Sequence, residues 1–137
     1  MPKQSPVPSA VDKPFWDACN AGRLVVQSCK NCNRLQFPPR AECSQCGRSN
    51  TLEWRQLSGR GKIYSYAVVY DTPVASLQAD QPYNVGVIQL EEDPGILMLS
   101  HLPGTPVDKV PVGASVRVEF QATPATGQKV PEWRVVR

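Results

Sequence analysis

The residues of this sequence best suited to chemistry are two Cys-x-x-Cys pairs. Cys29 and Cys32 are separated by two residues, as are Cys43 and Cys46, and ten residues lie between the pairs. A two-residue gap lets the chain curl so that both sulfurs of a pair reach one metal ion, and four thiolates are a common ligand set of structural zinc. The spacing therefore predicts one zinc ion held by all four cysteines.

The four cysteines have two alternative interpretations. The pairs could be separate redox or buried thiols, and iron also accepts four tetrahedral sulfurs. Zinc is favoured because both pairs have the spacing of knuckles that face each other, and Asn33 and Gly47, which follow them, tolerate the positive φ of such turns. A closed four-sulfur shell leaves no coordination position for water, so the metal is expected to organise the fold.

The remaining reactive residue types form no catalytic set in the sequence. Cys19 is a lone thiol on a predicted helix and is expected to pack beside Trp16. His101, the only histidine, lies in an apolar strand and is expected to have one ring nitrogen satisfied. The acidic run 91–93 falls in a turn, and Gly59–Lys62 is too short for a Walker phosphate loop. No catalytic residue is assigned, and the chain is predicted not to be an enzyme.

A short helix is predicted before the cysteines, over Asp12–Gly22. Asp12 can cap it, Pro14 suits its first turn, and Gly22 can end it. A strand, Arg23–Gln27, then leads into the first cysteine pair, and a second extended piece follows at residues 35–37.

From Leu52 onward, apolar or β-branched runs alternate with glycine and proline breaks, and no helix is predicted. The connection 91–95 is expected to be a hairpin turn. The predicted strands are Thr51–Leu57, Lys62–Asp71, Tyr83–Leu90, Ile96–His101, Ser115–Ala122 and Glu132–Val136.

Strands so few and so short favour a small closed barrel of the OB-fold type over a two-sheet sandwich. The predicted fold class is mainly β: a short N-terminal helix, a zinc ribbon and then an OB-fold barrel. The expected division is a flexible arm at 1–11, the helix and ribbon at 12–50 and the barrel at 51–137.

The composition is that of an ordinary soluble globule. The 137 residues are 41% hydrophobic and 20% charged, and no apolar run approaches the roughly 20 residues that span a membrane. The proline-rich N-terminus has no apolar core of a secretion signal, so a cytoplasmic location is expected.

Positive charge is concentrated in the first part of the chain. Residues 1–55 hold eight Lys/Arg and four Asp/Glu, a balance of +4, whereas residues 56–137 hold seven and eight, a balance of −1. The run 64–70 places Tyr64, Tyr66 and Tyr70 on one predicted strand face, which could stack bases in a nucleic-acid-binding barrel. The negative balance of the barrel half makes nucleic acid the less favoured partner.

The order of motifs resembles the acyl-CoA-associated family that joins a zinc ribbon to an OB-fold, also called domain-of-unknown-function family thirty-five. The resemblance runs from Phe15 to Arg134 and rests on these motifs: Phe15-Trp16, Gly22-Arg23-Leu24, the two cysteine pairs, Phe37-Pro38-Pro39-Arg40, Ser58–Tyr66, Pro82-Tyr83 and Pro131-Glu132-Trp133-Arg134. Members are similar in having an N-terminal helix, a rubredoxin-like ribbon and an OB barrel. They partner thiolase-fold enzymes, including thiolases, acetyltransferases and lipid-transfer-protein-type aldolases.

The resemblance implies a non-catalytic accessory subunit in a hetero-oligomer with a thiolase-fold enzyme, with no membrane contact. It would help form the partner's acyl-CoA site, and a CoA thioester would be shared with that partner. Contacts to CoA or to the partner are expected from Arg40, Arg60, Lys62, Tyr64 and Tyr66. The alternative is a stand-alone nucleic-acid-binding module. The connection Thr72–Pro82 is longer than in many relatives, which leaves the shape of a substrate channel open.

Overall fold

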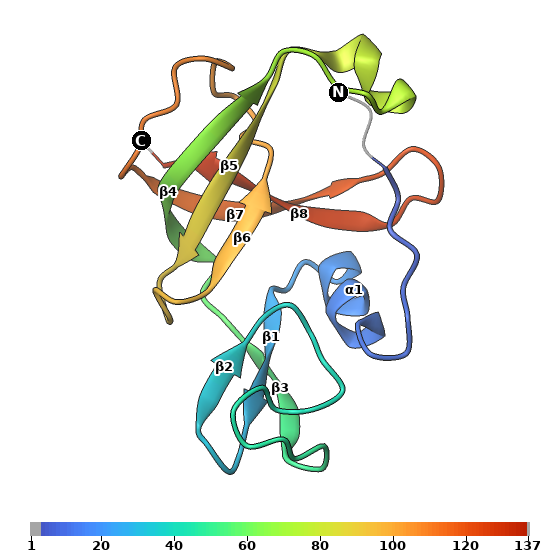
Figure 1. Cartoon of the computed structure of the whole chain (residues 1–137), viewed down its shortest axis with the longest axis vertical. Coiled ribbons are helices and arrows are strands. Elements are labelled where there is room, and N and C mark those ends of the chain that lie inside the picture. The colour runs from blue at the N-terminus through green and yellow to red at the C-terminus, as the bar shows by residue number, and fades with distance from the viewer. Residues whose placement is uncertain (1–3, 137) are drawn as a thin grey trace.

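The computed structural model describes residues 4–136 and contains one α-helix and two antiparallel sheets among them (Figure 1). A three-stranded sheet has the order β2-β1-β3, and a five-stranded sheet has the order β6-β5-β4-β7-β8. The elements are α1 (Lys13–Asn20), β1 (Val25–Cys29), β2 (Arg34–Gln36), β3 (Leu52–Gln56), β4 (Arg60–Val69), the 3-10 helix η1 (Ala75–Asp80), β5 (Tyr83–Leu90), β6 (Leu97–Ser100), β7 (Ser115–Ala122) and β8 (Lys129–Val135).

Helix α1 lies within the predicted range Asp12–Gly22, but its cap differs. Pro14 lies in the first turn, and Gly22 adopts φ 76° just after the helix. The predicted capping role of Asp12 is wrong: its side chain makes no cap hydrogen bond and instead accepts one from the Ser9 hydroxyl at 3.0 Å. The carboxylate is therefore used by the turn before the helix.

The three-stranded sheet belongs to the ribbon and includes a strand that the sequence assigned to the barrel. Strand β3, from the predicted strand Thr51–Leu57, pairs antiparallel with β1, with Val25 opposite Gln56 and Cys29 opposite Leu52. Nothing in the local sequence of residues 51–57 distinguishes a barrel strand from a ribbon strand, because the choice depends on pairing with β1. The last ribbon strand then leads directly into β4 (Figure 1).

The five-stranded sheet curls into an OB-like half-barrel. Strands β5 and β7 have the predicted bounds, and the hairpin turn at residues 91–95 is confirmed by a backbone bond from Ile96 N–H to Asp93 O at 3.0 Å. The hydrogen-bonded ladder of the described strands stays open between β6 and β8, so the closed barrel that was predicted is a partly open one. The Trp133 N–H of β8 donates to Ser100 Oγ of β6 at 3.0 Å across that seam.

Three local features of the barrel half depart from the prediction. A β-bulge between Ile63 and Ser65 interrupts the alternation of β4. The connection Thr72–Pro82 contains η1, although no helix was expected after Leu52. Strand β8 starts at Lys129 and so includes Pro131, which was placed in a gap; an edge strand tolerates proline because one side of its backbone makes no ladder bonds.

The N-terminal segment from Gln4 lies against the barrel half and then leads down to α1 (Figure 1). Gln4 Nε2 donates to Ser76 Oγ at 2.8 Å, and the Ser5 hydroxyl donates to Thr123 Oγ1 at 2.7 Å. Residues 1–3 of the predicted arm lie outside the described residues.

One hydrophobic core joins the helix, the ribbon strands and the barrel. Buried residues of this core come from all three parts: Phe15, Cys19, Leu24, Val26, Leu57, Ile63, Ile88, Leu90, Ile96, Met98, Leu102, Val110, Val116 and Trp133. Trp133 is fully buried, and removing a side chain of this size typically costs about 3–5 kcal/mol. The start of β4 is thus held from both sides, by the ribbon and by the barrel.

Replacing Gly59 with alanine is expected to destabilise the fold by about 3 kcal/mol, because the site has φ 77° and an added Cβ would lie 2.7 Å from Val118 Cγ1. Gly127→Ala is the matched control, since Gly127 has the same φ of 77° and open space around its Cβ position. It should cost only about 1–2 kcal/mol. Chemical denaturation of the two variants measures the difference, and equal losses would show that Gly59 does not lie against Val118.

Candidate metal centre and cation-lined pocket

The four predicted ligands form one cluster at the far end of the ribbon. Their sulfur atoms all lie within 4.8 Å of one another. Cys29 Sγ is 3.8 Å from Cys46 Sγ, and Cys43 Sγ is 3.9 Å from Cys32 Sγ. A tetrahedron with zinc–sulfur bonds of about 2.3 Å has sulfurs about 3.8 Å apart. The donor set therefore fits one zinc ion, and the alternative of two separate thiol pairs is wrong.

Each knuckle is closed by the turn that its sequence indicated. Asn33 has φ 56° and donates its N–H to Cys29 O at 2.7 Å, and Gly47 has φ 74° and donates to Cys43 O at 2.9 Å. Both residues thus adopt the predicted positive φ. The two turns direct the sulfurs of both pairs to one point.

Hydrogen bonds to sulfur prepare the site for a cation. The Thr51 hydroxyl lies 3.2 Å from Cys29 Sγ and, together with the Cys32 N–H at 3.4 Å, lowers the pKa of the Cys29 thiol to about 6. A hydrogen bond with the Cys46 sulfur, then burial, and then the sulfurs of Cys43 and Cys29 raise the pKa of the Cys32 thiol to about 12, because hydrogen bonding to the neutral form and loss of solvent both oppose ionisation of a thiol. A dication at the centre favours the ionised form of all four thiols, so the cluster suits a bound metal better than a set of free thiolates.

Two buried glutamines, whose structural role was not predicted, hold the second knuckle against the sheet. Gln27 and Gln36 lie opposite each other on β1 and β2, and Gln36 Nε2 donates to Gln27 Oε1 at 2.8 Å. Gln27 also accepts from the Arg40 N–H at 2.8 Å, and Gln36 accepts from the Ser44 N–H at 2.9 Å. Their burial and pairing follow only from the strand register, so no local sequence signal identifies them.

The residues predicted to contact CoA or a partner fall into three places. Arg60 and Lys62 lie together on one face at the start of β4. Tyr64, at the bulge, is 58% exposed, whereas Tyr66 is half-buried against the core. Arg40 lies in the ribbon and lines a separate hollow beside the second knuckle. The expected single face of tyrosines is therefore wrong, because the bulge places Tyr64 and Tyr66 on different sides.

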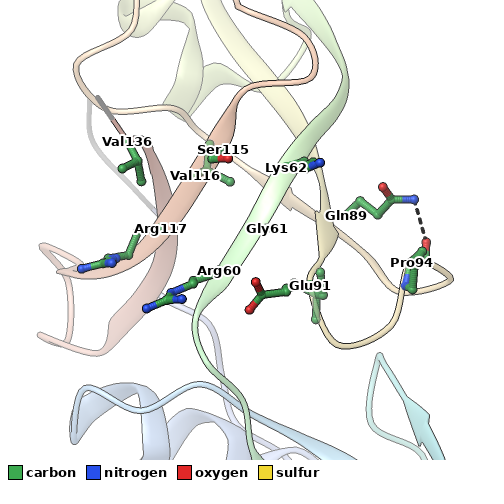
Figure 2. A pocket seen from close by; sticks show the side chains of 11 residues that line it. Arg60, Gly61, Lys62, Gln89, Glu91, Pro94, Ser115, Val116, Arg117 and Val136 are labelled. Carbon is green, nitrogen blue, oxygen red and sulfur yellow. Dashed lines mark hydrogen bonds between the residues drawn. The ribbon is translucent and has the colours of Figure 1, made fainter.

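Arg60 and Lys62 line a pocket of about 580 Å³ on the outside of the barrel (Figure 2). Strand β7 contributes Arg117 and Ser115, which stand opposite Arg60 and Lys62 in the ladder. Gln89, whose amide donates to Pro94 O at 3.1 Å, lies on the β5 side. Arg117 was missed by the sequence analysis because its place beside Arg60 depends on the pairing of β4 with β7, strands about fifty residues apart in the chain.

His101 lies where the sequence suggested, at the end of an apolar strand, and has one ring nitrogen satisfied. Its Nδ1 is 3.0 Å from Asn84 O, and its ring meets Tyr83 edge-on with centroids 5.6 Å apart. Cys19 is fully buried in the core, and burial raises the pKa of its thiol to about 12. The chain's fifth cysteine is thus a protonated core residue.

Comparison with known proteins places both halves of the chain. Residues 16–53 match the family model described as ChsH2, rubredoxin-like zinc ribbon domain, and residues 54–121 match ChsH2, C-terminal OB-fold domain. A DUF35 domain-containing scaffold protein of Methanocaldococcus jannaschii is 34% identical over 98 residues, which are 72% of this chain and 67% of that protein. The chain belongs to the DUF35 family.

The four cysteines of this DUF35 protein accordingly form a structural zinc site, and the OB-fold prediction is confirmed. The two family models meet between residues 53 and 54, within β3.

Two further relatives of this DUF35 chain have names that mention enzymes. A probable enoyl-CoA hydratase alpha subunit of Thermomonospora curvata is 32% identical over 112 residues. The match includes 80% of this chain but only 33% of that subunit, so the chain spans about a third of that relative's length. The solved structure of an Ltp2-ChsH2(DUF35) aldolase contains a chain that superposes with TM-score 0.81 and 27% identity, covering 96% of this chain and 98% of that one. Within residues 4–136, no helix is long and apolar enough to cross a membrane.

Replacing Cys43 with serine is expected to abolish zinc binding and unfold the ribbon, because the free energy of metal binding is folding free energy in a module this small. Cys19→Ser is the matched control and should retain one zinc per chain. Elemental analysis and circular dichroism of the two variants measure the effect. Equal zinc loss from both would contradict the ligand assignment.

The Cys19 thiol is expected to resist alkylation in the folded protein. Because its pKa rises from 9.0 to about 12, the thiolate fraction at pH 8 falls about a thousandfold relative to an ordinary thiol. Mass spectrometry after iodoacetamide treatment of the zinc-loaded protein tests this, with guanidinium-unfolded protein as the control. Labelling of the folded chain at the rate of the unfolded one would show that Cys19 is not a core residue.

Proposed function

We propose that this chain is a non-catalytic accessory subunit that binds a thiolase-fold acyl-CoA enzyme and helps form its acyl-CoA site. The observation that carries the proposal is the superposition on a chain of the Ltp2-ChsH2(DUF35) aldolase along 96% of this chain. The scaffold-protein name of the archaeal relative supports it. The assembly would be a hetero-oligomer with chemistry on the partner.

The use of the chain's own thiols supports a non-catalytic role. Four cysteines share one closed ligand set, in which a tetrahedral metal has no open position for substrate. The fifth, Cys19, is fully buried with a raised pKa of about 12. A thiol nucleophile for acyl transfer has to be exposed and has to ionise readily, so these residues suit structure rather than acyl transfer.

The start of β4 is the part of the chain that we propose contacts CoA and the partner. Arg60 and Lys62 are exposed in one pocket, and Tyr64 lies two residues beyond Lys62 with 58% of its surface exposed. Cations complement the phosphates of CoA, and exposed aromatic side chains are typical interface anchors. Arg40 is proposed as a ribbon contact to the partner, and Tyr66, half-buried against the core, as a minor one.

The position of the tyrosines favours this proposal over nucleic-acid binding. A base-stacking barrel needs aromatic rings in a row on one accessible face. The bulge exposes Tyr64 and leaves Tyr66 against the core, so the row is broken.

Substituting Tyr64 with alanine is expected to weaken assembly with the partner by about tenfold, as loss of an exposed aromatic anchor commonly does. Tyr70→Ala is the matched control, because Tyr70 is also exposed, at 66%, but lies beyond the far end of β4. Tyr66→Ala is avoided because it would disturb the core. Each variant would be co-expressed with the thiolase-fold enzymes of the same genome, one at a time.

Light scattering of the purified complexes then gives the fraction assembled. Loss of assembly with Tyr64→Ala and not with Tyr70→Ala supports the proposed interface. If no complex forms with the unmodified chain, the accessory-subunit proposal itself fails.

A further inference from the structure

Three arginines stand in one row across three adjacent strands. Arg60 of β4 is opposite Arg117 of β7, and Arg117 is opposite Arg134 of β8. Side chains directly opposite each other in an antiparallel pair have Cβ atoms about 5 Å apart, and like charges in this position are destabilising. Three positive charges in adjacent positions are thus unfavourable for the stability of the sheet itself.

Among residues 4–136, one arginine of this row is neutralised by an ion pair. Arg134 forms a two-pronged ion pair with Glu119, with Nε to Oε2 at 2.9 Å and Nη2 to Oε1 at 3.1 Å. Among residues 4–136, neither Arg60 nor Arg117 takes part in an ion pair or a side-chain hydrogen bond of its guanidinium. Toward the described residues, the two guanidiniums that line the pocket therefore keep their hydrogen-bonding capacity free.

The rest of the pocket adds positive charge and a hydroxyl. Lys62 is two residues along β4 from Arg60, which is about 7 Å along a strand, and Ser115 stands opposite Lys62. Glu91 is the one carboxylate among the lining residues, and its Oε2 already accepts from the Ser58 hydroxyl at 3.0 Å. The pocket has a net charge of +2, because three cations and one carboxylate line it: Arg60, Lys62, Arg117 and Glu91. Figure 2 shows the two arginines on one side of Gly61 and Lys62 further along the strand.

We propose that Arg60, Arg117 and Lys62 form a clamp for a diphosphate group, and that this chain binds that group on its own, before any partner is present. This rests on the proposed function and deepens it, because CoA is one carrier of a diphosphate. A guanidinium binds phosphoryl oxygens through two parallel hydrogen bonds, whereas an ammonium binds as a point charge. Two guanidiniums and an ammonium, spaced over several ångströms, match two linked phosphoryl groups better than a single one.

The size of the site agrees with a ligand that carries more than the anion. A volume of about 580 Å³ is within the range of small-molecule sites and exceeds what a single phosphate fills. Arg117 and Ser115 are new contributors to this site, and they come from a different strand from the residues that the sequence indicated.

The test is calorimetric titration of the zinc-loaded full chain with inorganic pyrophosphate at low salt. Inorganic phosphate, ADP and CoA are titrated in parallel to separate the possible sources of the diphosphate. We expect pyrophosphate, ADP and CoA to bind. Inorganic phosphate should bind about tenfold more weakly, because it contacts one guanidinium instead of two. Binding should weaken as salt is raised, since the site is exposed.

Variants separate the clamp from general surface charge. Arg117→Ala should weaken pyrophosphate binding about tenfold or more. The affinity of Arg117→Lys should lie between that of Arg117→Ala and that of the parent, because lysine keeps the charge but cannot form the two parallel hydrogen bonds of a guanidinium. Arg55→Ala is the matched control: Arg55 is an exposed arginine of β3 in the ribbon sheet, and its loss should change binding less than twofold. Arg117→Ala removes a repulsion from an exposed position, so thermal melting without ligand should show no loss of stability.

Three results would overturn the clamp: no pyrophosphate binding by the parent chain, parent-like binding by Arg117→Ala, or equal weakening by Arg55→Ala. These outcomes are independent of the proposed function, because assembly with the partner is measured separately and without added anion. If the complex forms while pyrophosphate does not bind, the clamp fails and the accessory role stands. If pyrophosphate binds as expected while no complex forms, the clamp stands and the accessory role fails.

Discussion

Four thiolates around one dication are the constraint on which the rest of this structure depends. The ribbon is too small to fold around a core of its own, so the metal supplies the free energy that closes its two knuckles. Thr51, whose hydroxyl contacts the Cys29 sulfur, immediately precedes β3, and β3 pairs with β1 along its whole length. The metal site thereby fixes the strand that leads into the barrel.

A short connection, held by backbone hydrogen bonds on both sides, joins the ribbon to the strand that lines the pocket. After β3 ends, Leu57 donates its N–H to Leu24 O at 2.9 Å, and Gly59 accepts from the Val118 N–H at 2.8 Å. The chain is thus held to β1 on one side and to β7 on the other immediately before Arg60. The pocket is lined by residues of the barrel half and begins at Arg60, the first residue of β4 after this connection.

The sequence predicted features set by local spacing and missed features set by pairing between distant strands. The zinc ligands, the positive φ of Asn33 and Gly47 and the bounds of β5 and β7 were all predicted, because each depends on a few neighbouring residues. The assignment of β3 to the ribbon was not predicted, because that choice is made by contact with β1.

The same distinction applies to the candidate site. Arg60 and Lys62 line the pocket, and their contact role remains a prediction from their motif. Arg117 joins them only through the register of β7 against β4. The bulge that separates Tyr64 from Tyr66 has no signal in the alternating pattern of residues 64–70. Asp12 had the residue type and position of a cap, yet its carboxylate is taken by Ser9, a competing partner three residues earlier.

The central claim is that this chain completes an acyl-CoA site whose chemistry belongs to another subunit. Its most direct test is steady-state turnover of acyl-CoA by a thiolase-fold enzyme that assembles with this chain, assayed for the enzyme alone, for the enzyme with this chain, and for this chain alone. We predict no turnover by this chain alone and a higher kcat/KM for the enzyme when the chain is added. Equal turnover by the enzyme with and without the chain, or turnover by the chain alone, would contradict it.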